Sequence, residues 1–269
     1  MTIQIDSLAY TNKLRLLPPE QKVLFAFALL VLTYVAQVPV QLLIALWMVI
    51  WTVVYARIPA PIYFKLMSIP AGFWLSSLPA FIISGVATAN YTEVQTDVWK
   101  GLTVGGYYLY LSSHGMQQAG ELLARAIAST SCLYFVMLTV PFIELLQILR
   151  RLRCPPLLTD LLLLMYRFIF TLLGTANKLW TAQQSRNGYR TWKIGMNSLG
   201  ILVGQLLQRT LMNYRQVSLS LASRGFNGEF RVWHSRQYSP SWRYSLEALL
   251  GCGGLIGLAG WSYSGFHLS

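Results

Sequence analysis

The sequence has few charged residues, and acidic residues are especially scarce. Only 11% of the 269 residues are charged, and nine of them are Asp or Glu. Because a soluble domain is typically about one quarter charged, this composition excludes most soluble proteins. A hydrophobic content of 55% excludes a disordered chain, and three scattered cysteines exclude a disulfide-stapled scaffold. The class that remains is an integral membrane protein.

The residues that build common catalytic and metal sites are also sparse. The three histidines lie far apart, and the three cysteines show none of the short spacings of metal ligands. The sequence contains neither the Gly-rich lysine motif of nucleotide-binding loops nor the paired Asp residues of a diphosphate site. We therefore predict no enzyme activity, no metal site and no cofactor. An integral membrane enzyme that modifies lipids is the less favoured alternative.

Long uncharged stretches predict the membrane-spanning helices. Residues 23–56 contain no charged side chain, and these 34 residues would form a helix of about 51 Å, longer than the ~30 Å hydrocarbon core of a bilayer. We therefore expect a helical hairpin that turns at Pro39. Residues 101–120 are uncharged and rich in Gly and Tyr, which suits an outer hairpin as well as a sixth span. The five predicted spans are residues 22–38, 40–57, 66–88 and 126–143, and a last one within 244–269.

Nearly all of the net positive charge lies in one block of the chain. Residues 144–243 hold 14 Lys and Arg against 3 Asp and Glu, whereas the whole chain has a net charge of +12. Cytoplasmic loops of membrane proteins are enriched in Lys and Arg. This rule places the N-terminus, the loop with Arg57 and Lys65, and the block in the cytoplasm, and five spans leave the C-terminus outside. The chain thus divides into residues 1–143 with four spans, the cytoplasmic domain 144–243 and the C-terminal span 244–269.

The basic block is predicted to form two long amphipathic helices. Polar side chains recur every three or four residues along residues 159–186 and again along 197–224, while the other faces are rich in Leu. Each helix has 28 residues and a length of about 42 Å. We expect Gly188 and Gly225 to adopt left-handed conformations just after the two helices. Because the block is rich in Leu rather than Lys, we expect no binding to nucleic acid.

Both predicted helices end in a similar short motif. The first ends Ser185-Arg186-Asn187-Gly188 and the second ends Ser223-Arg224-Gly225. An arginine at the C-terminal end of a helix complements the helix dipole and keeps five N–H donors free for a carboxylate partner. Two such tips suggest two equal receptors, such as the subunits of a symmetric dimer. On spacing alone, the alternative is a pair of ordinary helix stop signals in a loop whose charge reflects topology.

The last predicted span is rich in glycine. Its small residues are Gly251, Gly253, Gly254, Gly257 and Gly260. Small side chains let membrane helices approach one another closely. We therefore expect this helix to contact another membrane subunit.

Several further short motifs follow one another along most of the chain. They are Ile5-Asp6-Ser7-Leu8-Ala9, Leu14-Arg15, Pro19-Glu20-Gln21-Lys22, Ala128-Ser129-Thr130-Ser131, Leu138-Thr139-Val140-Pro141, Pro155-Pro156-Leu157-Leu158 and Tyr166-Arg167-Phe168-Ile169-Phe170. With these motifs and the two arginine tips, the sequence resembles the transmembrane (T) component of energy-coupling factor transporters, specifically its CbiQ-type cobalt branch. The tips match the paired X-Arg-X signatures of that family. The first tip differs, because Ser185 and Asn187 stand where Ala and Gly are usual.

This resemblance implies an all-α, multi-pass protein of a bacterial or archaeal cell membrane that is not an enzyme. A T component lies in the bilayer between a substrate-binding membrane subunit and two cytoplasmic ATPase subunits, which form a homodimer or a heterodimer. Each tip docks on one ATPase, and ATP-driven closure moves the two helices and reshapes the substrate subunit. Cobalt is the favoured substrate, and nickel or a vitamin is the alternative. The implied ATPase-coupling residues are Ser185, Arg186, Asn187, Gly188, Ser223, Arg224 and Gly225.

Overall fold

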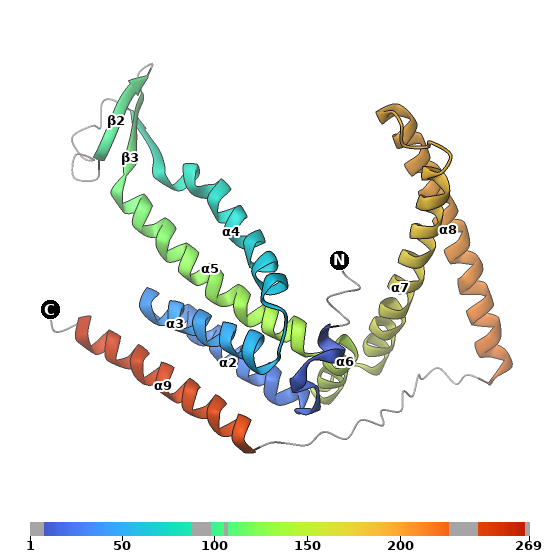
Figure 1. Ribbon diagram of the computed structural model, residues 1–269, viewed down its shortest axis with the longest axis horizontal. Coiled ribbons are helices and arrows are strands. Elements are labelled where there is room, and N and C mark those ends of the chain that lie inside the picture. The colour runs from blue at the N-terminus through green and yellow to red at the C-terminus, as the bar shows by residue number, and fades with distance from the viewer. Residues whose placement is uncertain (1–7, 88–97, 105–106, 226–241, 267–269) are drawn as a thin grey trace. The chain divides into compact units, whose positions relative to one another are not determined.

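The chain folds mainly into helices, which confirms the predicted helical fold class (Figure 1). One small antiparallel sheet is the exception among the described residues. The computed structural model describes residues 8–87, 98–104, 107–225 and 242–266.

The chain divides into two compact units, Met1–Glu144 with Arg236–Ser269, and Leu145–Ser235. A further helix, α6 (Phe142–Arg151), contains the boundary between them. The helical elements of the first unit are the 3₁₀ turn η1 (Lys13–Leu16), α2 (Pro19–Val35), α3 (Val38–Val49), its continuation as the π-helix η2 (Ile50–Tyr55), α4 (Ala60–Ile82), α5 (Ser113–Thr139) and α9 (Trp242–Phe266).

Helix α5 forms the centre of the hydrophobic core of the first unit, where it packs against α2, α3 and α4. The ring of Phe135 on α5 lies edge-on to Phe25 of α2, with ring centroids 5.9 Å apart, and edge-on to Trp51 of η2 at 6.4 Å. Leu29 and Ile44 are fully buried beside this aromatic cluster. Because aromatic side chains bury large apolar areas and prefer edge-on contacts, these rings hold the N-terminal hairpin against α5.

The turn of the N-terminal hairpin lies at Ala36 and Gln37, so the predicted turn at Pro39 is wrong. Pro39 instead stands in the first turn of α3, where the missing N–H of proline breaks no helical hydrogen bond. The Nε2 atom of Gln41 donates to the carbonyl oxygens of Thr33 at 3.1 Å and Ala36 at 2.9 Å. One buried amide thus satisfies backbone acceptors at the end of α2 and fixes the hairpin.

Helices α4 and α5 both begin earlier than predicted. Helix α4 starts at Ala60 rather than at residue 66 and ends at Ile82, where the chain enters a strand. Helix α5 starts at Ser113 rather than at residue 126. Its first turns are polar, so they do not look like part of an apolar span in the sequence, but they are helical. It ends at Thr139, before residue 143, because Pro141 cannot continue the helix.

A three-stranded sheet lies between α4 and α5 in the sequence. Its strands are β1 (Ile83–Ala87), β2 (Val98–Val104) and β3 (Tyr107–Ser112), and they pair antiparallel in the order β1-β3-β2. In the register, Leu109 of β3 lies opposite both Gly85 and Leu102. Alternating Tyr and Leu residues favour β3 as a strand. The described part of residues 101–120 therefore forms most of β2, all of β3 and the first turns of α5, which agrees with a hairpin rather than with a sixth helical span.

The second unit is a helical hairpin of α7 (Pro156–Gln184) and α8 (Trp192–Ser223), which run antiparallel from a shared loop (Figure 1). Both helices begin earlier than the predicted residues 159 and 197. Pro155 stands at the N-cap of α7 and Pro156 in its first turn, where proline is favoured. Leu179 and Leu202 are buried. Polar side chains of both helices, including Thr175 and Asn213, line a narrow gap between them.

Three described helical segments are long and apolar enough to cross a membrane, namely Val38–Tyr55, His114–Thr139 and Pro156–Gln184. The first two overlap predicted spans. The third is α7, which was predicted to lie in the cytoplasm, and its Leu157 is 72% exposed and its Met165 60% exposed. Membrane spans and helices covered by a partner share such apolar surfaces. The number and position of the spans therefore stay predictions.

Candidate functional site

The first predicted tip is the loop between α7 and α8. Its backbone turns at Asn187, which has a φ of 58°. The expectation that Gly188 adopts this left-handed conformation is therefore wrong by one residue. Asparagine is one of the few residues other than glycine that tolerate this region, because its short side chain can bond locally. The N–H groups of Arg186 and Gly188 both donate to the carbonyl oxygen of Gln183, at 3.1 and 2.9 Å, and close the loop over the last turn of α7.

Residue 188 must be glycine because there is no room for a side chain, and not because of its backbone conformation. A Cβ atom at this position would lie 2.9 Å from the carbonyl oxygen of Gln183 and 3.0 Å from the Oγ atom of Ser198. The first distance is shorter than Cβ atoms normally tolerate, and it involves a backbone atom that cannot turn aside. The loop can therefore lie directly on the start of α8 only because residue 188 lacks a side chain.

A chain of side-chain contacts connects α7, the first tip and α8. The hydroxyl of Tyr189 donates to Oε1 of Gln183 at 2.7 Å, and Nε2 of Gln183 donates to the carbonyl of Ser198 at 3.1 Å. The hydroxyl of Ser198 donates to the carbonyl of Gly188 at 2.7 Å. The rings of Trp180 and Tyr189 stack with centroids 4.2 Å apart. No local sequence pattern reveals this network, because its members are scattered over two helices and a loop.

The outer side of the first tip is basic and exposed. Arg186, Arg190 and Lys193 are all exposed, and the indole of Trp192 is 84% exposed. Within the described part of the chain, no carboxylate pairs with Arg186 or Arg224. Arg and Trp are the residues most enriched in the energetically dominant parts of protein interfaces. The surface of this tip therefore suits a partner that offers carboxylates to the arginines and an apolar surface to Trp192.

The second predicted tip has a simpler structure. Gly225 has a φ of +68°, as expected for a left-handed residue after a helix, and its N–H donates to the carbonyl of Ala222 at 3.2 Å. The N–H of Arg224 donates to the carbonyl of Leu221, and the hydroxyl of Ser223 donates within the same helix at 3.0 Å. A Cβ atom on Gly225 would meet no described atom within 4 Å. This glycine is therefore required for its conformation, in contrast to Gly188.

The two arginines stand beyond opposite ends of the same helix. Arg186 precedes α8, and Arg224 directly follows it. The 32 residues of α8 are one uninterrupted helix and give a length of about 48 Å. Two receptors that bind both tips at once must therefore present their docking sites at a comparable distance.

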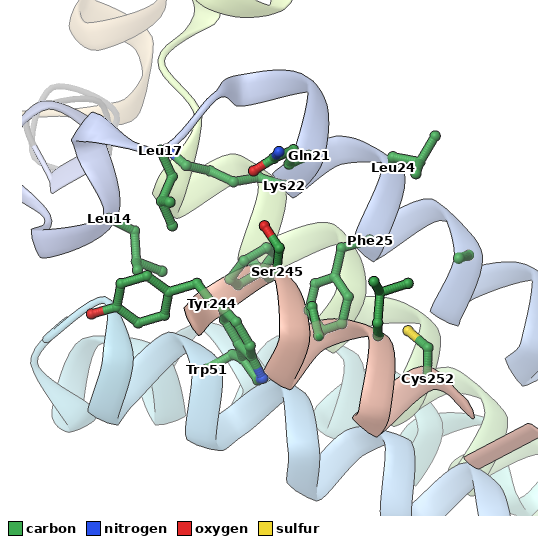
Figure 2. Close-up of a pocket in the computed structure, with 14 residues that line it drawn as sticks. Leu14, Leu17, Gln21, Lys22, Leu24, Phe25, Trp51, Tyr244, Ser245 and Cys252 are labelled. Carbon is green, nitrogen blue, oxygen red and sulfur yellow. The ribbon is translucent and has the colours of Figure 1, made fainter. Parts of the chain in front are cut away.

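An apolar pocket of about 320 Å³ opens in the first unit, between η1, α2, η2, α5 and α9 (Figure 2). Phe25, Trp51 and Tyr244 form its apolar walls, and Lys22 lies at one end. The Nζ atom of Lys22 does not point to an open site, because it donates to the carbonyl of Thr139 at 3.3 Å. Within the described residues, no three His, Cys, Asp or Glu side chains are placed to hold a metal ion.

The glycines of α9 have different surroundings. A Cβ atom on Gly251 would lie 2.6 Å from the indole of Trp47 in α3, so this glycine allows α9 to pack on the same chain. The other four have no described atom within 4 Å of such a Cβ position. The predicted contact with another membrane subunit stays a prediction, which now concerns Gly253, Gly254, Gly257 and Gly260.

The apolar helices define this chain as a helical membrane protein. A family model described as cobalt transport protein, CbiQ, matches residues 10–234, and the chain therefore belongs to the CbiQ family. The cobalt transport protein CbiQ of Salmonella typhimurium is 30% identical over 232 residues, which cover 85% of this chain and 99% of that protein.

Two further relatives have similar coverage. CbiQ of Rhodobacter capsulatus is 30% identical over 233 residues, or 86% of this chain and 88% of that protein. An uncharacterized protein of Methanocaldococcus jannaschii is 30% identical over 243 residues, or 90% of this chain and 87% of that protein. The similarity thus extends over both units of the chain.

Proposed function

We propose that this chain is the transmembrane energy-coupling component of an ATP-driven importer. In this role it transmits motion from two cytoplasmic ATPase subunits to a separate substrate-binding membrane subunit. The observation that carries the proposal is the pair of exposed arginines, Arg186 and Arg224, at the two ends of one helix in a member of the CbiQ family.

The chemistry of the tips supports contact with acidic grooves on the ATPases. A guanidinium group presents five N–H donors in a planar fork that suits carboxylates. Each arginine also lies at the C-terminal end of a helix, where its positive charge offsets the negative end of the helix dipole, which would otherwise repel a carboxylate. The first tip adds Arg190 and the exposed Trp192, so we expect it to form the larger interface.

We infer that the chain hydrolyses no ATP itself. The whole sequence lacks the Gly-rich lysine motif that binds nucleotide phosphates, so ATP is bound by the partners. The proposed topology has five spans in a bacterial or archaeal cell membrane, with the N-terminus and residues 144–243 in the cytoplasm and the C-terminus outside. The charge distribution supports it.

Cobalt is the substrate that we favour for the complete transporter, because the chain belongs to a family of cobalt transport proteins. The three histidines of this chain are far apart in sequence, which supports recognition of the ion by another subunit. Nickel and vitamins are the alternatives.

Affinity purification of the tagged chain in mild detergent tests the assembly, and uptake of radiolabelled cobalt, nickel or vitamin by cells tests the transport. The wild-type chain should bring down two ATPase subunits and a membrane subunit. Arg186→Glu and Arg224→Glu should each lower ATPase recovery and uptake, and the double variant should abolish both, because acidic residues repel an acidic groove.

The matched control is Arg215→Glu, which makes the same charge change at an exposed position within α8. It should leave assembly and uptake close to those of the wild type. Normal ATPase recovery and uptake in the double tip variant would overturn the coupling role of the tips.

A further inference from the structure

The first tip is built differently from the second, although the two sequence motifs are similar. Two side-chain hydrogen bonds and one aromatic stack connect the loop 185–191 to α7 and α8, and a third side-chain bond joins Gln183 of α7 to Ser198 of α8. Among the described residues, the second tip has only backbone bonds and the bond of Ser223 within its own helix. The first tip is thus connected through side chains to both of its helices.

We propose that Gln183, Tyr189 and Ser198 are positioning residues, which hold the first tip in one conformation so that Arg186 meets its partner already ordered. This inference rests on the proposed docking of Arg186 on an ATPase subunit. The side chain of Arg186 is exposed and lies outside these side-chain hydrogen bonds, while its backbone N–H donates to the carbonyl of Gln183. The network therefore acts on the backbone that carries Arg186 rather than on its guanidinium group.

The hydrogen bonds form a continuous path through the tip. Gln183 is central, because its side chain accepts from Tyr189 and donates to Ser198, while its backbone carbonyl accepts from Arg186 and Gly188. One residue of α7 therefore connects to the loop on both sides of Asn187 and to α8. Gln183, Gly188, Tyr189 and Ser198 are each half-buried, so the bonds between them are partly shielded from competing water.

Order in the free tip matters for binding and for the transmission of motion. A loop that is disordered in the free protein loses conformational entropy when it docks, and this loss weakens the complex. A loop that is already fixed on both helices avoids this loss. It also transmits a push on Arg186 to α7 and α8 together, because α7, the loop and α8 are held as one piece.

Hydrogen exchange on the full-length protein in mild detergent tests the order of the tip without any partner. We expect amides of residues 185–191 in the wild type to exchange at least about tenfold more slowly than in Tyr189→Phe, which loses the hydroxyl but keeps the ring that stacks on Trp180. Exchange at wild-type tip amides as fast as in an unfolded peptide would overturn the inference. The control Tyr214→Phe alters an exposed ring on α8 and should change nothing at the tip.

A double-mutant cycle tests whether the network acts through Arg186. The probe is the purified ATPase subunit pair of the same transporter, and its affinity for the full-length chain is measured. Tyr189→Phe and Ser198→Ala should each weaken binding about fivefold, as expected for one lost hydrogen bond. In an Arg186→Ala background the same changes should have almost no further effect, whereas in an Arg224→Ala background they should keep their full effect.

The outcomes separate this inference from the proposed function. Equal losses in both arginine backgrounds, or no loss at all, would overturn the positioning role. If the wild-type chain does not bind the ATPase pair, the proposed function fails, while the exchange experiment still decides whether the tip is ordered. Ser198→Ala provides a second variant should Tyr189→Phe fail to fold. Ser220→Ala on α8 is its matched control, because the hydroxyl of Ser220 donates to the carbonyl of Val217 in its own helix.

Discussion

Asn12 and Lys22 donate to the same backbone oxygen, that of Thr139, and both distances are 3.3 Å. Thr139 is the last residue of α5, so its carbonyl group has no acceptor role within the helix. Both side chains are buried, with exposed fractions of 5% and 4%. Two residues from the start of the chain thus bind the end of the central helix of the first unit.

The Asn12 amide should contribute measurably to the stability of the first unit. Its Nδ2 atom also donates to the carbonyls of Ala9 at 2.8 Å and Leu138 at 3.3 Å. Asn12→Leu removes these donors and leaves buried acceptors, so we expect the free energy of unfolding to fall by about 1–3 kcal/mol. Thermal unfolding in detergent measures the change. The exposed neighbouring variant Thr11→Ala is the control, and equal melting temperatures for the two variants would contradict the prediction.

Packing of α9 on α3 should depend on the absence of a side chain at residue 251. Gly251→Ala forces a methyl group into the indole of Trp47, so we expect a loss of about 1–3 kcal/mol. The same melting experiment measures it. Gly254→Ala is the matched control, because a Cβ atom there meets no described atom within 4 Å. The prediction is wrong if Gly251→Ala melts no earlier than Gly254→Ala.

Labelling near the N-terminal ends of α4 and α5 tests the predicted orientation of the first unit in the membrane. In a chain without its three native cysteines, Lys65→Cys should react with an impermeant maleimide only after the cells are permeabilised. His114→Cys should react in intact cells, because α5 is predicted to start on the outer side. Both positions are exposed in the fold. The reverse pattern would contradict the topology that the charge distribution predicts.

The position of α7 relative to the bilayer can be tested in the same way. Leu157 and Lys178 are both exposed on α7 and lie about 31 Å apart along the helix, which is close to the thickness of the hydrocarbon core. In a cytoplasmic α7, Leu157→Cys and Lys178→Cys should both react from the inner side. Reaction from opposite sides would identify α7 as a span, in agreement with its length and apolarity.

The two tips show what glycine patterns in a sequence reveal and what they leave open. Gly225 has the left-handed conformation that a glycine after a helix predicts. At the first tip Asn187 adopts the left-handed conformation instead. Residue 188 is glycine because α8 lies too close to allow a side chain there. A sequence shows that a glycine is present, whereas the reason for it depends on atoms from residues far along the chain, here Ser198.

Long uncharged stretches predicted the helices of the first unit and helical periodicity predicted the two long helices of the second, because both patterns are local properties of the sequence. The tip network joins residues of α7, a loop and α8, and it depends on how these elements pack. The sequence indicated a possible hairpin within residues 101–120 but not the three-stranded sheet, since strand pairing between residues 83–87 and 107–112 is settled by tertiary contacts. Pro39 was assigned to a turn because proline favours both turns and first helical turns.

The unbroken course of α8 sets a direction as well as a distance. Each residue in a helix turns the chain by about 100° and advances it by about 1.5 Å. Two residues inserted in α8 would lengthen it only slightly, yet they would rotate Arg224 by about 200° to the opposite side of the helix. Seven inserted residues would restore its direction to within about 20° while adding about 10 Å. If both tips dock at once, the rotational phase of α8 is therefore under tighter constraint than its length.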